Sequence, residues 1–117
     1  YLNAVDFPDA ISRGCHPVDI HAASSTQQRC EFLKEAAFIP YRTLIAPDFP
    51  NLLVAGRSFS ADAVASASVR VQASVMGLGQ AAGAAAAQCV RTGADVAEVD
   101  VEQLRRTLTE YGANLTA

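Results

Sequence analysis

An alanine- and glycine-rich run in the second half of the chain constrains its fold more than any other sequence feature. The run Ser74–Arg91 contains no proline and is rich in alanine, the residue with the highest helix propensity. Gly93 follows shortly after it, where glycine commonly ends a helix by adopting a left-handed conformation. The sequence therefore predicts one long helix over Ser74–Arg91.

Small residues recur along one side of this helix. Gly79, Gly83 and Ala87 are spaced four residues apart, so they share a face. A glycine in a helix interior costs about 1 kcal/mol relative to alanine, which suggests that another group must approach the backbone closely. For Gly83 we expect tight packing against a neighbouring strand or helix.

The rest of the chain divides at Asn51. All five prolines precede this residue, and they leave short extended candidates at 17–21 and 37–40. The apolar run Leu52–Ala55 ends at a glycine, as a buried parallel strand would, and it predicts a core strand. We therefore expect an α/β fold in two parts, with residues 1–50 as returning strands and loops and residues 51–117 as a core strand followed by helices.

A second helix is predicted near the end of the chain. Asp100 can cap its first turn, Leu104 and Leu108 give it an apolar face, and Gly112 follows its end. This helix is expected to serve as scaffold.

Composition excludes several classes of partner. Half of the residues are hydrophobic and 18% are charged, which favours a packed segment over a disordered one. The net charge is -3 and Lys34 is the only lysine, so nucleic acid is not an expected partner. The weakly polar run 73–90 has too little large apolar surface to favour a bilayer, and no membrane partner is expected.

The cysteines and histidines give no sign of a metal site. Cys15, Cys30 and Cys89 are odd in number and contain no CxxC pair, which disfavours a disulfide framework. Together with His16 and His21, the first two match no usual zinc spacing, so we expect no metal. Reduced thiols are the default, which favours the cytoplasm without fixing the compartment.

One glycine pattern suggests a nucleotide site. The sequence from Gly77 to Gly83 has the form GxGxxxG, and 69–75 alternates enough to resemble a strand, so a phosphate loop opening a helix is conceivable. No second strand ending in an acidic residue follows at the expected interval. A small nucleotide-binding domain is therefore a weaker alternative.

A longer pattern carries a family resemblance. Within 39–87 the sequence runs IPYRTL, NLLVAGR, SVRV and LGQAAGAAA in this order, with PVDIH at 17–21 before it and LRRTL at 104–108 after it. This order resembles the C-terminal part of the FAD-dependent oxidoreductase family that includes xanthan-lyase-like flavoproteins.

The resemblance implies an FAD site. It implies the C-terminal part of a two-domain, Rossmann-like FAD-binding fold, with residues 1–50 as a returning segment of the substrate or cap domain and residues 51–117 as the last strand and helices of the FAD-binding domain. It makes the strand that ends in Gly-Arg the last strand of the FAD-binding sheet, and it places the start of the long helix near the pyrimidine edge of the flavin. Helix N-terminal N–H groups and an arginine would stabilise negative charge on a reduced flavin there. The positions implied beside the cofactor are Gly56, Arg57 and Arg70, and the turn formed by Met76, Gly77, Leu78, Gly79 and Gln80.

A catalytic candidate lies in the first segment. Asp19 and His21 alternate on a predicted strand, so they share one face, where a carboxylate could tune a proton-transferring imidazole. A hydrogen-bonded histidine with a purely structural role remains the alternative. His21 is the expected catalytic residue.

The family's phosphate-binding start is not encoded here. Residues 1–50 contain no GxGxxG loop after a strand, and the chain opens at Tyr1 without a methionine. We therefore expect a fragment that is inactive alone, within a longer FAD-dependent oxidoreductase that acts on a small-molecule substrate and can form a homo-oligomer. The alternative is a stand-alone, non-catalytic oligomerisation module built on the Gly/Ala helix.

Overall fold

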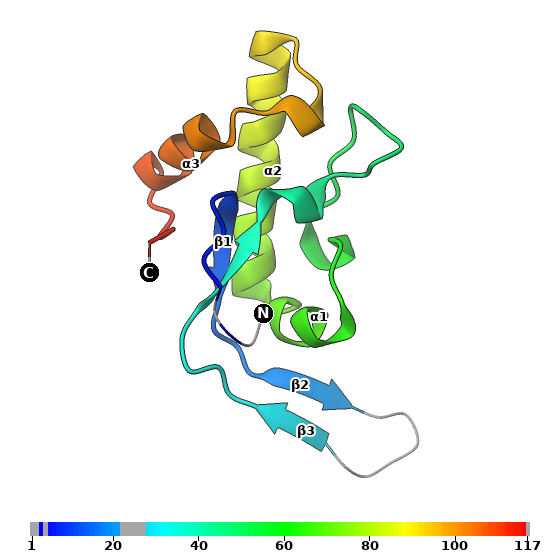
Figure 1. Ribbon diagram of the computed structural model, residues 1–117, viewed down its shortest axis with the longest axis vertical. Helices are drawn as coiled ribbons and strands as arrows, with labels where there is room; N and C mark the ends of the chain where they lie inside the picture. The colour runs from blue at the N-terminus through cyan, green and yellow to red at the C-terminus, as the bar shows by residue number, and fades with distance from the viewer. Residues whose placement is uncertain (1–2, 4, 22–27, 117) are drawn as a thin grey trace.

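The residues that the structure describes form two antiparallel strand pairs and three α-helices, an α/β fold (Figure 1). The structure is a computed structural model that describes residue 3, residues 5–21 and residues 28–116, with only the backbone of Gln28 and Arg29. The strands are β1 (Ala10–Gly14), β2 (Val18–His21), β3 (Gln28–Glu31) and β4 (Ala37–Pro40). The helices are α1 (Ala63–Val69), α2 (Gln72–Thr92) and α3 (Val101–Glu110).

The two strand pairs differ in what covers them. β1 pairs with β4 and packs against α2, and β4 is buried along its whole length. β2 pairs with β3 at the far end of the molecule, beside α1, where Val18 is buried but His21 is exposed (Figure 1). The extended segments expected at 17–21 and 37–40 are confirmed as β2 and β4. Their partners β1 and β3 were not anticipated.

The long helix is confirmed and is slightly longer than expected. α2 begins at Gln72 instead of Ser74 and ends at Thr92. Gly93 adopts a left-handed conformation, with φ of 73°, and donates its N–H to the carbonyl oxygen of Cys89 at 2.8 Å. At the other end Val71 is the N-cap residue and supplies no side-chain hydrogen bond.

The helix expected near the end of the chain is also confirmed. Asp100 Oδ1 accepts a hydrogen bond from the Gln103 N–H at 3.0 Å, which caps α3. Leu104 and Leu108 are each only 1% exposed and hold the helix against the core. Gly112 follows the end of the helix with a positive φ of 89°.

A single hydrophobic core joins the two parts of the chain on either side of Asn51. Ile11 on β1 and Ile39 on β4 belong to the same buried cluster as Leu78 on α2 and Leu104 on α3. Nearby, the buried Tyr41 hydroxyl donates to the carbonyl oxygen of Val96 at 2.7 Å. Residues 1–50 therefore complete the packing of residues 51–117 instead of folding apart from them.

The prediction of a core strand at Leu52–Ala55 is wrong. The segment makes only an isolated bridge, between Leu53 and Ile45, and Leu52 is 42% exposed. In the part of the chain that the structure describes, no parallel strand lies beside it to extend the pairing. An apolar run forms a buried strand only where a neighbouring strand satisfies its backbone groups.

Met76–Gln80 lie inside α2, as the predicted helix over Ser74–Arg91 requires, and they form no separate turn before it. The strand considered at 69–75 is likewise absent, since α1 runs to Val69 and α2 begins at Gln72. The GxGxxxG pattern is therefore interior helix, and it does not form a phosphate loop between a strand and a helix. The nucleotide-domain alternative loses its structural basis.

The glycines of α2 have different surroundings. A Cβ atom on Gly77 would lie 2.5 Å from Ser12 Oγ, so this glycine allows β1 to approach the helix. A Cβ atom on Gly79 or Gly83 would meet nothing within 4 Å. The tight packing expected at Gly83 is absent, and the face that carries both residues is open.

Candidate functional site

The junction between α1 and α2 holds β2 in place. Arg70 is the C-cap residue of α1, and its Nη2 donates to the carbonyl oxygen of Asp19 at 2.9 Å. Ser68 Oγ donates to the carbonyl oxygen of His16, just before β2. These two bonds bring together an arginine expected beside the cofactor and the strand that carries the catalytic candidate.

Asp19 and His21 form a pair on the exposed face of β2. The prediction that they share a face is confirmed, because His21 Nε2 lies 2.9 Å from Asp19 Oδ2. The Asp19 side chain is 26% exposed and that of His21 is 62% exposed. A carboxylate at this distance fixes the ring orientation, and the other ring nitrogen is left to exchange a proton with a ligand.

The beginning of α2 offers hydrogen-bond donors beside Arg70. The first N–H groups of a helix have no acceptor within the helix, and here no side chain caps them. The helix dipole adds partial positive charge at this end, and the Arg70 guanidinium adds a full one. The donor set therefore suits an anionic or electron-rich ligand edge.

Gly56 and Arg57 lie in a short 3-10 helix, Gly56–Ser58, that contacts α2. Gly56 has a φ of 73°, a conformation that side-chain-bearing residues rarely adopt, so the chain requires glycine at this turn. Arg57 is exposed, and no carboxylate pairs with it among the described residues. It remains available to a ligand or to solvent.

The five consecutive candidates on α2 do not share one face. Leu78 is fully buried in the core, and Gly77 faces β1. Met76 is 66% exposed, and Gly79 and Gln80 are exposed as well. A single ligand outside the core can meet the side chains of the exposed members only, because one turn of a helix directs consecutive residues to all sides.

Sequence reasoning did not identify Ser68 as part of this site. Ser68 is fully buried and ties α1 to the segment before β2. Its position within a run of small residues gave no chemical signal, since serine there is equally compatible with packing alone. Only the fold shows which backbone carbonyl its hydroxyl reaches.

Within residues 3, 5–21 and 28–116, no three His, Cys, Asp or Glu side chains gather as metal ligands would. In the same residues no helix has both the length and the apolar character needed to cross a bilayer.

Comparison with known proteins gives one match. Residues 1–108 match the model of a family described as FAD dependent oxidoreductase. Among the curated proteins and the solved structures, none shows a significant match to the chain. The family match covers β1 to β4, α1, α2 and most of α3.

Proposed function

Because the chain belongs to the FAD-dependent oxidoreductase family, we propose that it supplies the flavin-ring side of an FAD site in a longer oxidoreductase. In this proposal residues 1–50 are a returning segment of the substrate or cap domain that packs against residues 51–117, and residues 51–117 close a Rossmann-like FAD domain at its C-terminal end. The resemblance to xanthan-lyase-like flavoproteins supports this placement. The substrate is a small molecule, and the isolated chain lacks the pyrophosphate loop that supplies much of the affinity for FAD.

The observation that carries the proposal is the uncapped start of α2 beside Arg70. Open N–H groups, the helix dipole and a guanidinium 2.9 Å from the Asp19 carbonyl oxygen converge at one junction. A reduced flavin holds negative charge at its pyrimidine edge, and these donors fit that charge. Gly56 and Arg57 would lie along the same cofactor, together with the exposed members of Met76–Gln80.

The Asp19–His21 pair gives the site a proton-transfer group. When bound, FAD supplies the ring that accepts a hydride. His21 would exchange a proton with the substrate through the ring nitrogen that Asp19 does not engage. Arg70 would hold β2, and with it this pair, at a fixed position relative to the start of α2.

The proposal is tested by measuring the flavin content and the midpoint potential of the longer, FAD-loaded oxidoreductase that contains this chain. Arg70→Ala removes a cation near the developing anion, so we expect a lower potential with much of the FAD retained. Gly79→Val adds bulk on an open helix face, where a Cβ atom meets nothing within 4 Å among the described residues, so FAD content should fall without loss of fold. Gln103→Ala on α3 is the control and should change neither property. Normal FAD content in Gly79→Val together with an unshifted potential in Arg70→Ala would refute the proposal.

An oligomerisation module remains the second candidate, because one face of α2 is exposed and apolar. Met76 is 66% exposed and Val90 is 86% exposed, and the open glycines Gly79 and Gly83 lie between them. Such a face can pack closely against another helix. Light scattering of the purified chain distinguishes the candidates: a dimer dispersed by Val90→Lys favours the module, and a monomer at high concentration counts against it.

A further inference from the structure

A hollow of about 450 Å³ lies on another side of α2, between β1 and the tail that follows α3. Ser12 and Arg13 from β1, Gln80 from α2 and Asn114 from the tail line it with polar groups. None of its lining residues is acidic. Gly77 also lines it, and the absence of a side chain there leaves the Ser12 hydroxyl uncovered.

Arg13 is held rigidly at this hollow. Its guanidinium lies over the Phe38 ring, 5.1 Å from the ring centroid. Its Nη1 donates to Asn114 Oδ1 at 3.1 Å and to the carbonyl oxygen of Thr116 at 2.5 Å. Its Nε is buried and has no hydrogen-bond partner among the described residues. A planar donor group that is already fixed in place loses little entropy when it binds a ligand.

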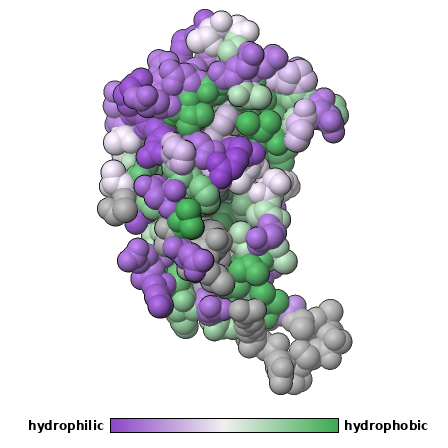
Figure 2. All heavy atoms as spheres, in the orientation of Figure 1, coloured by the Kyte–Doolittle hydropathy of each residue, from purple (hydrophilic) through white to green (hydrophobic). Residues whose placement is uncertain are grey.

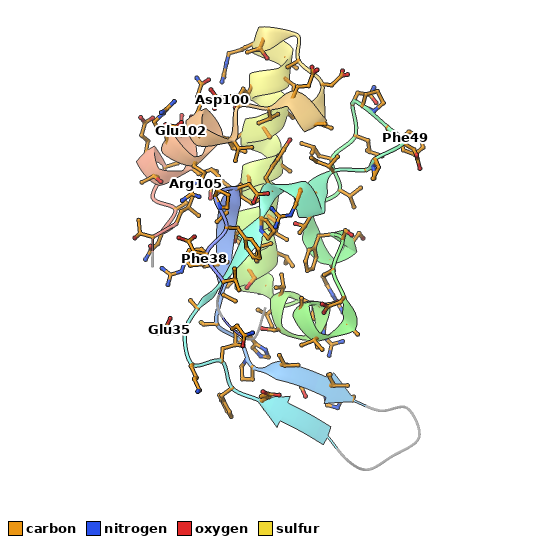
Figure 3. The ribbon with its side chains drawn as sticks, viewed as in Figure 1. Glu35, Phe38, Phe49, Asp100, Glu102 and Arg105 are labelled. Atoms are coloured by element: carbon orange, nitrogen blue, oxygen red, sulfur yellow. The ribbon has the colours of Figure 1, made fainter. Side chains whose placement is uncertain are left out.

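The positive charge on this side of the molecule is not neutralised within the described chain. Arg105, labelled in Figure 3, donates to the carbonyl oxygens of Phe7, Pro8 and Leu115, which are neutral acceptors. Neither Arg105 nor Arg13 pairs with a carboxylate among the residues that the structure describes. Two cations with only neutral acceptors favour an anion nearby.

Arg42 shows what a neutralised arginine looks like in the same fold. It also lies over an aromatic ring, that of Phe7, at 4.8 Å from the centroid. Its Nη1, however, makes an ion pair with Asp9 Oδ1 at 2.5 Å. Both arginines lie over an aromatic ring. Arg42 also has a carboxylate partner, and Arg13 has none among the described residues.

We propose that the hollow binds a small organic carboxylate, with Arg13 as its charge partner and the Ser12 hydroxyl as a further hydrogen-bond donor. Arginine and hydroxyl groups match the two oxygens of a carboxylate. The half-buried Ala113 lines the hollow together with the edges of Ile11 and Leu115, so the body of the molecule would meet carbon atoms there, which favours an organic acid over an inorganic anion. The hollow borders the proposed flavin site at Gln80, but Arg13 and Ser12, which would hold the carboxylate, do not belong to that site.

The test titrates the protein with benzoate as the probe. Binding is monitored by the NMR shifts of the Gln80 and Asn114 side-chain amides. Benzoate should bind saturably, and the neutral benzamide and inorganic phosphate should bind much more weakly. Arg13→Gln should weaken benzoate binding at least about tenfold, as expected for losing a charge-assisted hydrogen bond, and Arg13→Lys should recover part of it. Ser12→Ala should weaken binding less. Arg42→Gln, the matched control, should leave it unchanged.

Several outcomes would overturn the proposal. Benzamide binding as well as benzoate would mean that the hollow is merely apolar, and phosphate binding as well would refute the organic class of ligand. If Arg13→Gln does not fold, the comparison of benzoate with benzamide on the unchanged protein, together with Ser12→Ala, still decides whether the hollow binds a carboxylate. Absence of saturable benzoate binding refutes the carboxylate site. It leaves the flavin proposal standing, because that proposal is tested separately by FAD content.

Discussion

The two ends of the molecule are built differently, although one helix reaches both. At one end β1, β4, α3 and the body of α2 enclose Ile39, Leu78 and Leu104, each of them at most 1% exposed. At the other end β2 and β3 form a projecting pair of strands beside α1, where Val18 is buried and Asp19 and His21 face outward (Figure 1). Stability is therefore concentrated at the first end, and the exposed Asp19–His21 pair lies at the second.

Hydrophilic and hydrophobic atoms are also distributed unevenly over the surface. In Figure 2 the end around α3 is mostly hydrophilic, and hydrophobic atoms reach the surface over α1 and beside the loop that carries Phe49, labelled in Figure 3. Phe49 is 56% exposed and Leu52 is 42% exposed. Exposed apolar groups of this size mark surfaces that other protein can cover.

The largest effect is expected from truncating the packed end. Leu104 on α3 is 1% exposed within the core cluster, so Leu104→Ala should lower the free energy of unfolding by about 2–5 kcal/mol. Ile20→Ala on β2, where the residue is half-buried, should cost clearly less. Urea unfolding of both variants measures the difference. Equal losses would show that the two ends contribute alike.

Tyr41 gives a pH-dependent test of the packed end. Burial, and then the neighbouring Cys89, raise the pKa of Tyr41 to about 12 from 10.0. Below pH 10 the phenol is protonated in both states, and as the pH rises from 10 toward 12 the unfolded state loses its proton first, so stability falls. Tyr41→Phe should remove this additional decline. It should also cost about 1–3 kcal/mol at neutral pH, because the Val96 carbonyl loses its donor.

The Tyr41 experiment is unfolding of both proteins in urea at neutral pH and near pH 11. The difference between wild type and Tyr41→Phe isolates this group from others that titrate in alkali. If the difference is the same at both pH values, the phenol does not have the raised pKa described above.

A smaller effect separates the packed and open faces of α2. Gly79→Ala should raise the free energy of unfolding by about 1 kcal/mol, because alanine favours helix and its Cβ meets nothing within 4 Å. Gly77→Ala should gain less, since Ser12 Oγ must move away from the new Cβ. Ser12→Ala in the same protein should restore the gain. Equal gains at Gly77 and Gly79 without that second change would contradict the close packing of β1 on α2.

Local sequence signals predicted the helices better than the strands. Gly93 and Asp100 act at their own helix ends, so the ends of α2 and α3 could be predicted from single residues. The prediction of a strand at Leu52–Ala55 failed because a strand depends on a partner that can lie anywhere in the chain. β1 was missed for the same reason, because its partner β4 lies beyond the β2–β3 pair. β3 was missed because its sequence, QRCE, shows no alternation of apolar and polar residues.

In the candidate site, too, contacts between residues close in the sequence could be predicted, and contacts between distant residues could not. Asp19 and His21 are two residues apart, so alternation along a strand was enough to bring them together. The contact between Arg70 and the Asp19 carbonyl oxygen spans 51 residues and required the fold. Met76–Gln80 were grouped by adjacency, and the helix separates them into buried and exposed positions.

The smallest expected effect on stability is at the projecting end, where Asp19→Asn tests the role of the Asp19–His21 pair. Its two side chains are 26% and 62% exposed, so loss of the ion pair should change the free energy of unfolding by less than about 1 kcal/mol. An amide is a weaker hydrogen-bond partner than a carboxylate, so the NMR shifts of the His21 ring nitrogens should change in Asp19→Asn at constant pH. The matched variant is Glu102→Gln, which removes the exposed pair with Arg106 on α3 and should leave the His21 ring shifts unchanged. Unchanged ring shifts in Asp19→Asn would mean that the 2.9 Å contact does not hold the imidazole, and His21 would lose its proposed role as the proton-transfer group.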